Sequence, residues 1–149
     1  MPVNAEFQGR VYPPTPPYVV SAAKIREFAE AVGSADPVHT HVEVARARGY
    51  ADVVAPPTFA VLIAQQCEAQ LVTDPEAGID FSRVVHGEQS FLHHRPLAAG
   101  DAVVGTLHVD GVRQAGGHAM VTTRTELATE SGEPLCTATS TIVVRGGEE

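Results

Sequence analysis

Residues 33–39 read GSADPVH, and residues 54–64 read VAPPTFAVLIA. The first stretch is a polar turn that carries a carboxylate, Asp36, and a histidine, His39. The second stretch opens a helix that has almost no polar side over its first two turns. A helix that is apolar all round has to be wrapped by other parts of the fold. The two stretches therefore predict a buried helix with a polar turn ahead of it.

The remaining sequence pattern places helices first and strands second. Ser21 suits the N-cap of the first helix, and Gly33 suits its C-terminal end. In the second half, threonines interleave with apolar residues and short Gly-rich segments connect the runs, which favours antiparallel hairpins. The predicted helices are Ala22–Val32, Val42–Arg48 and one from Pro57 or Thr58 to about Leu71, and the predicted strands are Val84–His94, Ala102–Val112, His118–Thr129 and Leu135–Arg145.

The simplest packing of these elements is an α+β arrangement in which an antiparallel β-sheet curls around the long central helix. The length of 149 residues fits one domain over residues 1–149. An edge strand of such a sheet remains available for pairing with a second chain, so we expect a dimer.

Composition narrows the classes of partner. The net charge of −8 and the pI of about 5.3 argue against nucleic acid or an anionic membrane, because both attract basic surfaces. The longest apolar run is far short of the roughly 20 residues that cross a bilayer. No secretory signal is visible at the N-terminus, and Cys67 and Cys136 are expected to be reduced core residues. These features together predict a cytoplasmic protein.

Further motifs carry a resemblance to a known family. Residues 24–29 read KIREFA, residues 86–91 read HGEQSF, and residues 94–97 read HRPL, followed by Gly100-Asp101. Through these motifs and the two stretches above, the chain resembles proteins of the hot-dog fold. Within that fold it resembles the MaoC-like (R)-specific enoyl-thioester hydratases and 3-hydroxyacyl dehydratases. The resemblance is strongest to the small actinobacterial subunits that pair with a separate catalytic subunit to dehydrate (3R)-hydroxyacyl chains on acyl carrier protein.

The resemblance implies a role in fatty-acid metabolism, with an acyl-CoA or acyl-carrier-protein thioester as substrate and no cofactor. It implies either a homodimer or a heterodimer with a MaoC-like catalytic subunit. The active family motif reads Gly-Asp-x-Asn-Pro-Leu-His. In this chain Gly33 and His39 match it, Ser34 stands at the position of the catalytic aspartate, and Asp36 stands at the asparagine. The family also opens its helix with Ala-His-Gly-Met, and here Pro57 occupies the glycine whose N–H polarises the thioester carbonyl.

Hydration of a 2-enoyl thioester needs a base that activates water, an acid that protonates the α-carbon, and donors at the carbonyl. His39 is the candidate base, and its alternative role is a hydrogen bond within the turn. Asp36 is the candidate for the missing carboxylate, and its alternative role is an Asx-turn residue ahead of Pro37. Ser34 cannot replace an aspartate as acid or base, because its hydroxyl does not titrate near neutrality.

The helix opening is the candidate substrate-binding segment. Thr58 and Phe59 still offer N–H groups there, and Pro57 and Leu62 belong to the same candidate site. The alternative is an ordinary helix start with Phe59 in the core. Arg95 and Arg113 are candidates for contact with a ligand phosphate, and a metal site is not expected, because no metal-like ligand spacing occurs.

Two functions follow. In the first, the chain is the substrate-binding subunit of a (3R)-hydroxyacyl-thioester dehydratase or (R)-specific enoyl-thioester hydratase, and its partner carries the full catalytic motif. In the second, it is a self-sufficient homodimeric (R)-enoyl-CoA hydratase that uses Asp36 and His39. The losses at Ser34 and Pro57 affect different catalytic functions, which favours the first. A hot-dog thioesterase is less favoured, because Glu68 lies too far along the helix.

Overall fold

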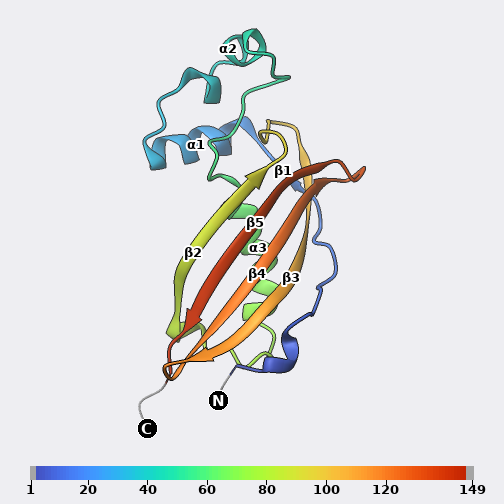
Figure 1. The fold of residues 1–149 in the computed structure, drawn as a ribbon. Helices are drawn as coiled ribbons and strands as arrows, with labels where there is room; N and C mark the ends of the chain where they lie inside the picture. Colours follow the sequence, from blue (N-terminus) through green and yellow to red (C-terminus); the bar gives the residue numbers. More distant parts are fainter. Residues whose placement is uncertain (1–2, 147–149) are drawn as a thin grey trace.

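The computed structural model describes residues 3–146 and contains one curled sheet with helices at its concave face and at one end (Figure 1). A single 3-10 turn at Ala5–Phe7 precedes the longer elements, and two more lie between them, at Pro37–His39 and Phe81–Arg83. In chain order, the longer elements are β1 (Tyr18–Val19), α1 (Ala22–Val32), α2 (Val42–Ala47), α3 (Ala60–Val72), β2 (Val84–His93), β3 (Ala102–Ala115), β4 (His118–Thr129) and β5 (Pro134–Val144).

The five strands form one antiparallel sheet in the order β1-β3-β4-β5-β2. The short β1 and the ten-residue β2 are therefore its edges. The register shifts between His86 and Glu88 in β2 and between Val109 and Gly111 in β3. Such bulges bend the bulged strand and increase the local twist, which helps the sheet to curl.

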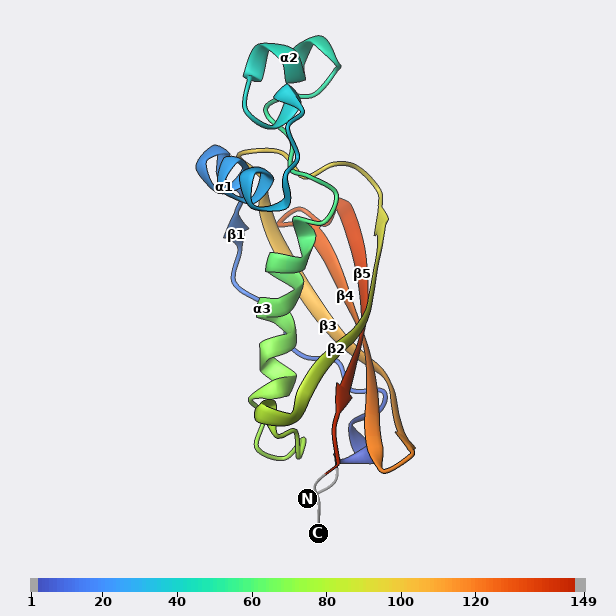
Figure 2. The same ribbon diagram turned by 90° about the vertical axis from the view of Figure 1, so that its left-hand side faces the viewer.

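Helix α3 lies along the concave face of the sheet (Figure 2). Its apolar side chains make this helix the centre of the core, as the sequence predicted for a helix without a polar side. The burial pattern of β3 alternates strictly over its first eight residues, so every second side chain faces α3. The buried residues of α3 and the position before it are Phe59, Ala60, Ile63, Ala64, Cys67 and Leu71.

One close approach fixes the distance between α3 and the sheet. Gly105 in β3 faces Cys67 of α3, and a Cβ atom at Gly105 would overlap the sulfur of Cys67. Glycine is used in strands where another segment comes this close. The two cysteines, Cys67 and Cys136, are both buried and unpaired, as predicted from the sequence.

The segment from α1 to α2 covers one end of the sheet, and α2 projects beyond it (Figures 1 and 2). Ser21 accepts a hydrogen bond from the N–H of Lys24 at 3.1 Å and so caps α1. Gly33 ends α1 in the left-handed conformation, with φ of 72°. The rings of Phe28 and Phe59 pack edge to face, with 5.4 Å between their centroids, and this contact attaches α1 to the start of α3.

Each predicted helix and strand is present, and α1 and β4 match the prediction at both ends, whereas β3 continues three residues past the predicted end at Val112, to Ala115. The third helix differs, because the regular α-helix begins at Ala60 rather than at Pro57 or Thr58. Phe59 donates its N–H to the carbonyl of Pro56 at 3.0 Å, so residues 57–59 form a turn that leads into α3. Within residues 3–146, no helix combines the length and the apolar character that a membrane span requires.

Candidate functional site

The polar turn between α1 and α2 is ordered by its own backbone and side-chain hydrogen bonds. The N–H of Ser34 donates to the carbonyl of Ala29 at 2.8 Å, just after the left-handed Gly33. Pro37 then starts the 3-10 turn that ends at His39, since its fixed φ suits a first helical position. The helix end at Gly33 and the 3-10 turn from Pro37 together place the side chains of Ser34 and His39 next to each other.

The His39 ring is held from both nitrogens. It is only 6% exposed, and its Nδ1 lies 2.7 Å from the carbonyl oxygen of Val54. Its Nε2 lies 2.8 Å from the hydroxyl oxygen of Ser34. A carbonyl oxygen can only accept a hydrogen bond, so Nδ1 carries the proton of the neutral ring. The hydroxyl of Ser34 therefore donates to the lone pair of Nε2, which is the atom that would take a proton from a catalytic water.

Asp36 lies in the same turn but is engaged elsewhere. Its carboxylate accepts from the N–H of Val38 at 3.0 Å and from Nη1 of Arg48 at 2.8 and 2.9 Å. The hydrogen bond from Val38 and the guanidinium of Arg48 lower the pKa of this carboxyl. The N–H of His39 donates to the backbone carbonyl of Asp36 at 3.2 Å, but within residues 3–146 no hydrogen bond joins the carboxylate of Asp36 to the ring of His39. This is the geometry of an Asx-turn residue that caps the turn.

The four candidate residues at the helix opening divide into two pairs. Pro57 and Thr58 are exposed, whereas Phe59 is fully buried and Leu62 is partly buried against the same core. The N–H of Phe59 is used within the turn, and no hydrogen bond of the described residues uses the N–H of Thr58. Of the two N–H groups of Thr58 and Phe59, only that of Thr58 is therefore open to a ligand.

Two cavities lie along β2, one at each end of the strand. The first has a volume of about 430 Å³ and combines His39 and Pro57 with residues from the end of β2 and the segment after it. The second has a volume of about 690 Å³ and lies between the later turns of α3 and the start of β2. Glu68 lines this second cavity and accepts a hydrogen bond from the hydroxyl of Thr123 at 3.0 Å. The second cavity is lined by Gln65, Glu68, Ala69, Val72, Thr73, Phe81, Val84, His86 and Ile142.

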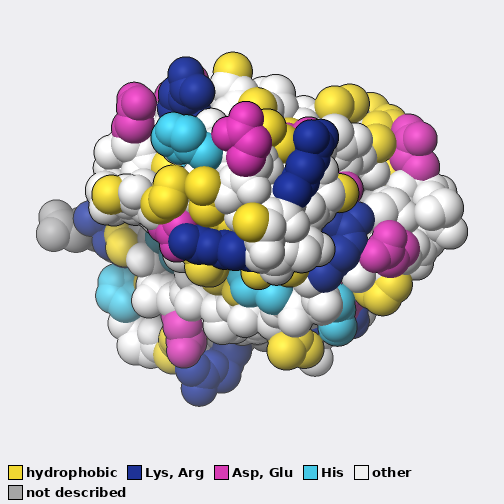
Figure 3. All heavy atoms as spheres, turned by 90° about the horizontal axis from the view of Figure 1, so that it is seen from above, with side chains coloured by type: hydrophobic (Ala, Val, Ile, Leu, Met, Phe, Trp, Pro, Cys, Tyr) yellow, Lys and Arg dark blue, Asp and Glu magenta, His cyan; other side chains and the backbone are white. Residues whose placement is uncertain are grey.

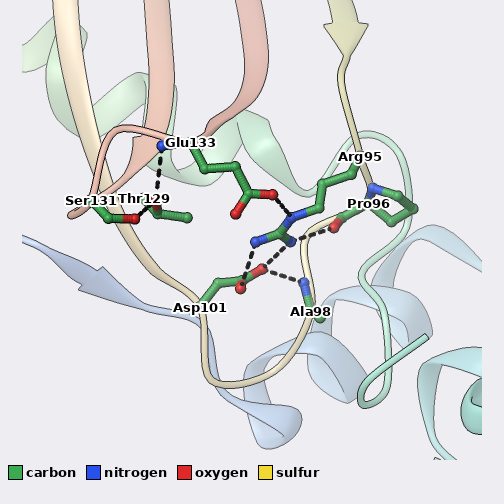
Figure 4. Close-up of polar contacts among 7 residues, drawn as sticks. All are labelled: Arg95, Pro96, Ala98, Asp101, Thr129, Ser131 and Glu133. Atoms are coloured by element: carbon green, nitrogen blue, oxygen red, sulfur yellow. Dashed lines mark hydrogen bonds and ion pairs between the residues drawn. The ribbon is translucent and has the colours of Figure 1, made fainter.

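Arg95, a candidate for phosphate contact, is paired within the chain (Figure 4). Its guanidinium donates to both oxygens of Asp101 at 2.8 and 3.1 Å and to Glu133 at 2.8 Å. These two carboxylates, Asp101 first, raise the pKa of Arg95. Asp101 also accepts from the N–H of Ala98, so the network joins the loop after β2 to the β4–β5 turn. The positive charge of Arg95 is therefore compensated by protein groups.

The surface at the α2 end has mixed polarity. In the view from above, acidic, basic and histidine side chains alternate with apolar ones on this face (Figure 3). The described residues contain no group of three or more histidine, cysteine, aspartate or glutamate side chains that could hold a metal ion.

This chain shares its fold with known proteins. Two solved structures share its architecture over most of its length. A (3R)-hydroxyacyl-ACP dehydratase complex, HadBC from Mycobacterium tuberculosis, has a TM-score of 0.83 at 29% identity, covering 92% of this chain and 96% of that one. A MaoC-like dehydratase has a TM-score of 0.87 at 30% identity, covering 95% of this chain and 43% of that one. The class is therefore that of the hot-dog hydratases and dehydratases.

The sequence comparisons assign the chain to a narrower group than this class. The sequence profile of the FAS1-like dehydratase domain region matches residues 6–138, and the chain belongs to this family. A UPF0336 protein of Saccharopolyspora erythraea is 52% identical over 149 residues, which is 100% of this chain and 96% of that protein. A UPF0336 protein of Clavibacter michiganensis subsp. michiganensis is 53% identical over 148 residues, which is 99% of each chain. The resemblance drawn from the sequence motifs is thereby confirmed at the level of family and fold.

Sequence reasoning did not identify two partners of the polar turn. Arg48, which binds Asp36, is the residue that follows α2, and nothing in its spacing indicates this contact. The carbonyl of Val54 binds His39 from the extended segment before the two prolines. The extended conformation could be predicted, because the residue before a proline avoids the helical region, but the direction of the carbonyl could not.

Proposed function

We propose that this chain is the substrate-binding subunit of a (3R)-hydroxyacyl-thioester dehydratase, or (R)-specific enoyl-thioester hydratase, whose partner subunit carries the complete catalytic motif. The observation that carries the proposal is the state of His39. No carboxylate of the described residues forms a hydrogen bond with its ring, and the hydroxyl of Ser34 occupies Nε2. Hydration needs a base and an acid that share one water, and His39 alone supplies at most one of them.

The thioester carbonyl also lacks its usual donor. Enolate charge develops on that oxygen, so preorganised N–H groups lower the barrier substantially. Pro57 has no N–H at the position where the family uses a glycine. Thr58 offers an N–H one residue later, but this replacement does not supply the missing carboxylate. Two separate deficits support a partner that performs the chemistry.

The unpaired edge of the sheet supports an assembly. Strand β2 pairs with β5 on one side only, and it exposes Val85 and Leu92, the latter at 63%. A long exposed edge strand pairs readily with another chain. In a two-fold antiparallel pair of β2-type edges, the end of one strand at His93 lies beside the start of the other strand at Val84. The catalytic turn of the partner then lies beside the 690 Å³ cavity of this chain.

That cavity suits the acyl tail of the substrate. Val72, Phe81, Val84 and Ile142 give it a largely apolar wall, and apolar burial is the main source of affinity for an alkyl chain. In this arrangement the partner holds the thioester and this chain holds the tail. The carrier is coenzyme A or acyl carrier protein, and the complex belongs to fatty-acid metabolism in the cytoplasm, where buried thiols remain reduced.

The test compares the chain alone with the chain and a partner. Hydration of trans-2-enoyl-CoA substrates of several lengths is measured for the purified chain, for a MaoC-like partner with the complete motif, and for their mixture. We expect no hydration by the chain alone and a gain on mixing that grows with acyl length. Ile142→Asp, which places a charge in the tail cavity, should reduce that gain, and Thr141→Asp, on the opposite face of β5, is the matched control.

The self-sufficient homodimer is the alternative outcome of the same assay. Hydration by the chain alone, lost in His39→Ala and in Asp36→Asn, would replace the subunit proposal with an enzyme that uses Asp36 and His39. The position of Asp36 against Arg48 does not favour this outcome, because the carboxylate would have to leave that ion pair to reach the ring.

A further inference from the structure

We propose that Ser34 and His39 form a nucleophile–base pair, and that this chain has a slow acyl-hydrolase activity toward short acyl thioesters and activated esters. This activity is distinct from hydration and does not need a partner subunit. It rests on the replacement of a carboxylate by an alcohol beside a fixed imidazole.

The geometry is that of an activated serine. A nucleophile–base site has the hydroxyl within hydrogen-bond reach of the base and the base oriented by a third group. Here the Ser34 hydroxyl lies 2.8 Å from Nε2 of His39, and the carbonyl of Val54 lies 2.7 Å from Nδ1. The carbonyl fixes the tautomer, so the lone pair of Nε2 points at the hydroxyl. A neutral carbonyl stabilises the charged ring less than an aspartate would, and we therefore expect a slow reaction.

The neighbouring hydroxyl–imidazole pair of Thr40 and His41 differs from the pair of Ser34 and His39 in how its ring is held. The Thr40 hydroxyl also lies 2.8 Å from a ring nitrogen, Nδ1 of His41. The side chain of His41 is exposed, however, and no other hydrogen bond of the described residues holds its ring. His39 is buried and bound at both nitrogens, so only the Ser34 pair has a fixed orientation.

His39 lines a cavity, and Ser34 is partly exposed although it is not among the residues that line that cavity. The cavity has a volume of about 430 Å³, and Pro57 and Leu97 also lie in its wall. This volume is at the lower end for ligand cavities, which favours short acyl groups. Thr58 follows Pro57, which lines the cavity, and no hydrogen bond of the described residues uses the N–H of Thr58, so this N–H is the candidate donor for the oxyanion of a tetrahedral intermediate.

The reaction has two balanced steps. In the first, Oγ of Ser34 bonds to the thioester carbonyl carbon and its proton passes to Nε2 of His39; the C–S bond then breaks, and the thiol leaves with that proton. In the second, water attacks the Ser34 ester, gives one proton to Nε2 and forms the carboxylic acid. The C–O bond to Ser34 breaks, and Oγ recovers the proton from Nε2. No oxidant, reductant or cofactor is consumed.

The first experiment treats the purified full-length chain with a serine-directed fluorophosphonate probe and locates the adduct by peptide mass spectrometry. We expect one adduct, at Ser34, and at least a tenfold slower labelling in His39→Gln, since general-base assistance contributes about 100-fold or more. Thr40→Ala removes the comparison pair and should label at the wild-type rate. An unlabelled Ser34 in a folded chain would overturn the proposal.

The second experiment does not depend on the stability of a His39 variant. Ser34→Cys places a thiol beside Nε2, and a neighbouring imidazole promotes the reactive thiolate. We expect iodoacetamide to alkylate this thiol at least tenfold faster than the buried Cys67 and Cys136. Hydrolysis of p-nitrophenyl acetate should fall about tenfold or more in Ser34→Ala. Equal alkylation rates, or unchanged hydrolysis in Ser34→Ala, contradict the proposal. Neither readout involves hydration or a partner, so the subunit proposal is tested separately.

Discussion

Asp36 is bound by Arg48 through both carboxylate oxygens, at 2.8 and 2.9 Å, and no hydrogen bond of the described residues joins this carboxylate to the ring of His39. The same carboxylate caps the 3-10 turn through the N–H of Val38. The carboxylate of Asp36 therefore links the 3-10 turn to Arg48, the residue that follows α2. Its position leaves Ser34 as the hydrogen-bond partner of Nε2 of His39.

The first prediction concerns acid stability. The hydrogen bond from Val38 and the guanidinium of Arg48 lower the pKa of Asp36 from 3.8. The contribution of Asp36 to the stability of the fold is therefore fully present above pH 3.8 and is lost as the pH falls through the lowered pKa. Asp36→Asn should therefore lower the melting temperature at pH 7, and the difference from wild type should shrink at the acid end. Glu43→Gln is the control, because Glu43 is exposed and has no hydrogen bond among the described residues. A pH-independent difference contradicts the prediction.

The second prediction concerns the contact between α3 and β3. Gly105→Ala should destabilise the fold by about 1–3 kcal/mol in urea unfolding, because the new methyl group overlaps Cys67. Cys67→Ala in the same chain should recover part of the loss, since the two sites are in contact. Gly111→Ala is the matched control in the same strand, where the nearest atom, Cβ of Thr122, is 3.9 Å away. Equal losses at both glycines would count against this explanation.

The third prediction concerns the network of Arg95. Arg95→Lys keeps the charge but loses the fork that binds both oxygens of Asp101, and it should cost about 1–3 kcal/mol of unfolding free energy. Asp101→Asn should cost less unfolding free energy than Arg95→Lys. In the double variant the two losses should not add fully, because both residues belong to one hydrogen-bond network. Lys24→Met breaks an exposed pair with Glu27 and should have no measurable effect.

The fourth prediction concerns the thiols. Burial raises the pKa of Cys136 to about 11 and also raises the pKa of Cys67. The thiolate is the reactive species, so both cysteines should resist iodoacetamide at pH 8 in the folded chain and react within minutes in urea. Intact-protein mass spectrometry counts the adducts. Rapid alkylation of the folded chain would mean that the core opens around α3.

The fifth prediction concerns the two sheet edges. Leu92 on β2 and Val19 on β1 are equally exposed, at 63% and 64%. If β2 pairs with another chain, Leu92→Arg should shift the protein toward the monomer in size-exclusion chromatography, with or without the MaoC-like partner. Val19→Arg on the opposite edge should leave the assembly unchanged. The reverse pattern would move the interface to β1.

The sequence by itself determined the local elements and their order. Ser21 and Gly33 mark the ends of α1, the run after Pro57 marks a buried helix, and the alternation in the second half marks the strands. These signals are local, because caps, periodicity and proline restrictions act within a few residues. The curled sheet also followed from the sequence, since an apolar helix has to be enclosed.

The tertiary structure decided which side chains meet. The hydrogen bonds from Ser34 to His39 and from His39 to Val54, and the ion pair of Asp36 with Arg48, join positions whose spacing carries no such information. A side chain has several possible rotamers and partners, and only packing in three dimensions selects among them. For that reason the sequence identified the polar turn as the candidate site and placed Ser34 at the aspartate position, and the structure alone showed that Ser34, and not the carboxylate of Asp36, binds the ring of His39.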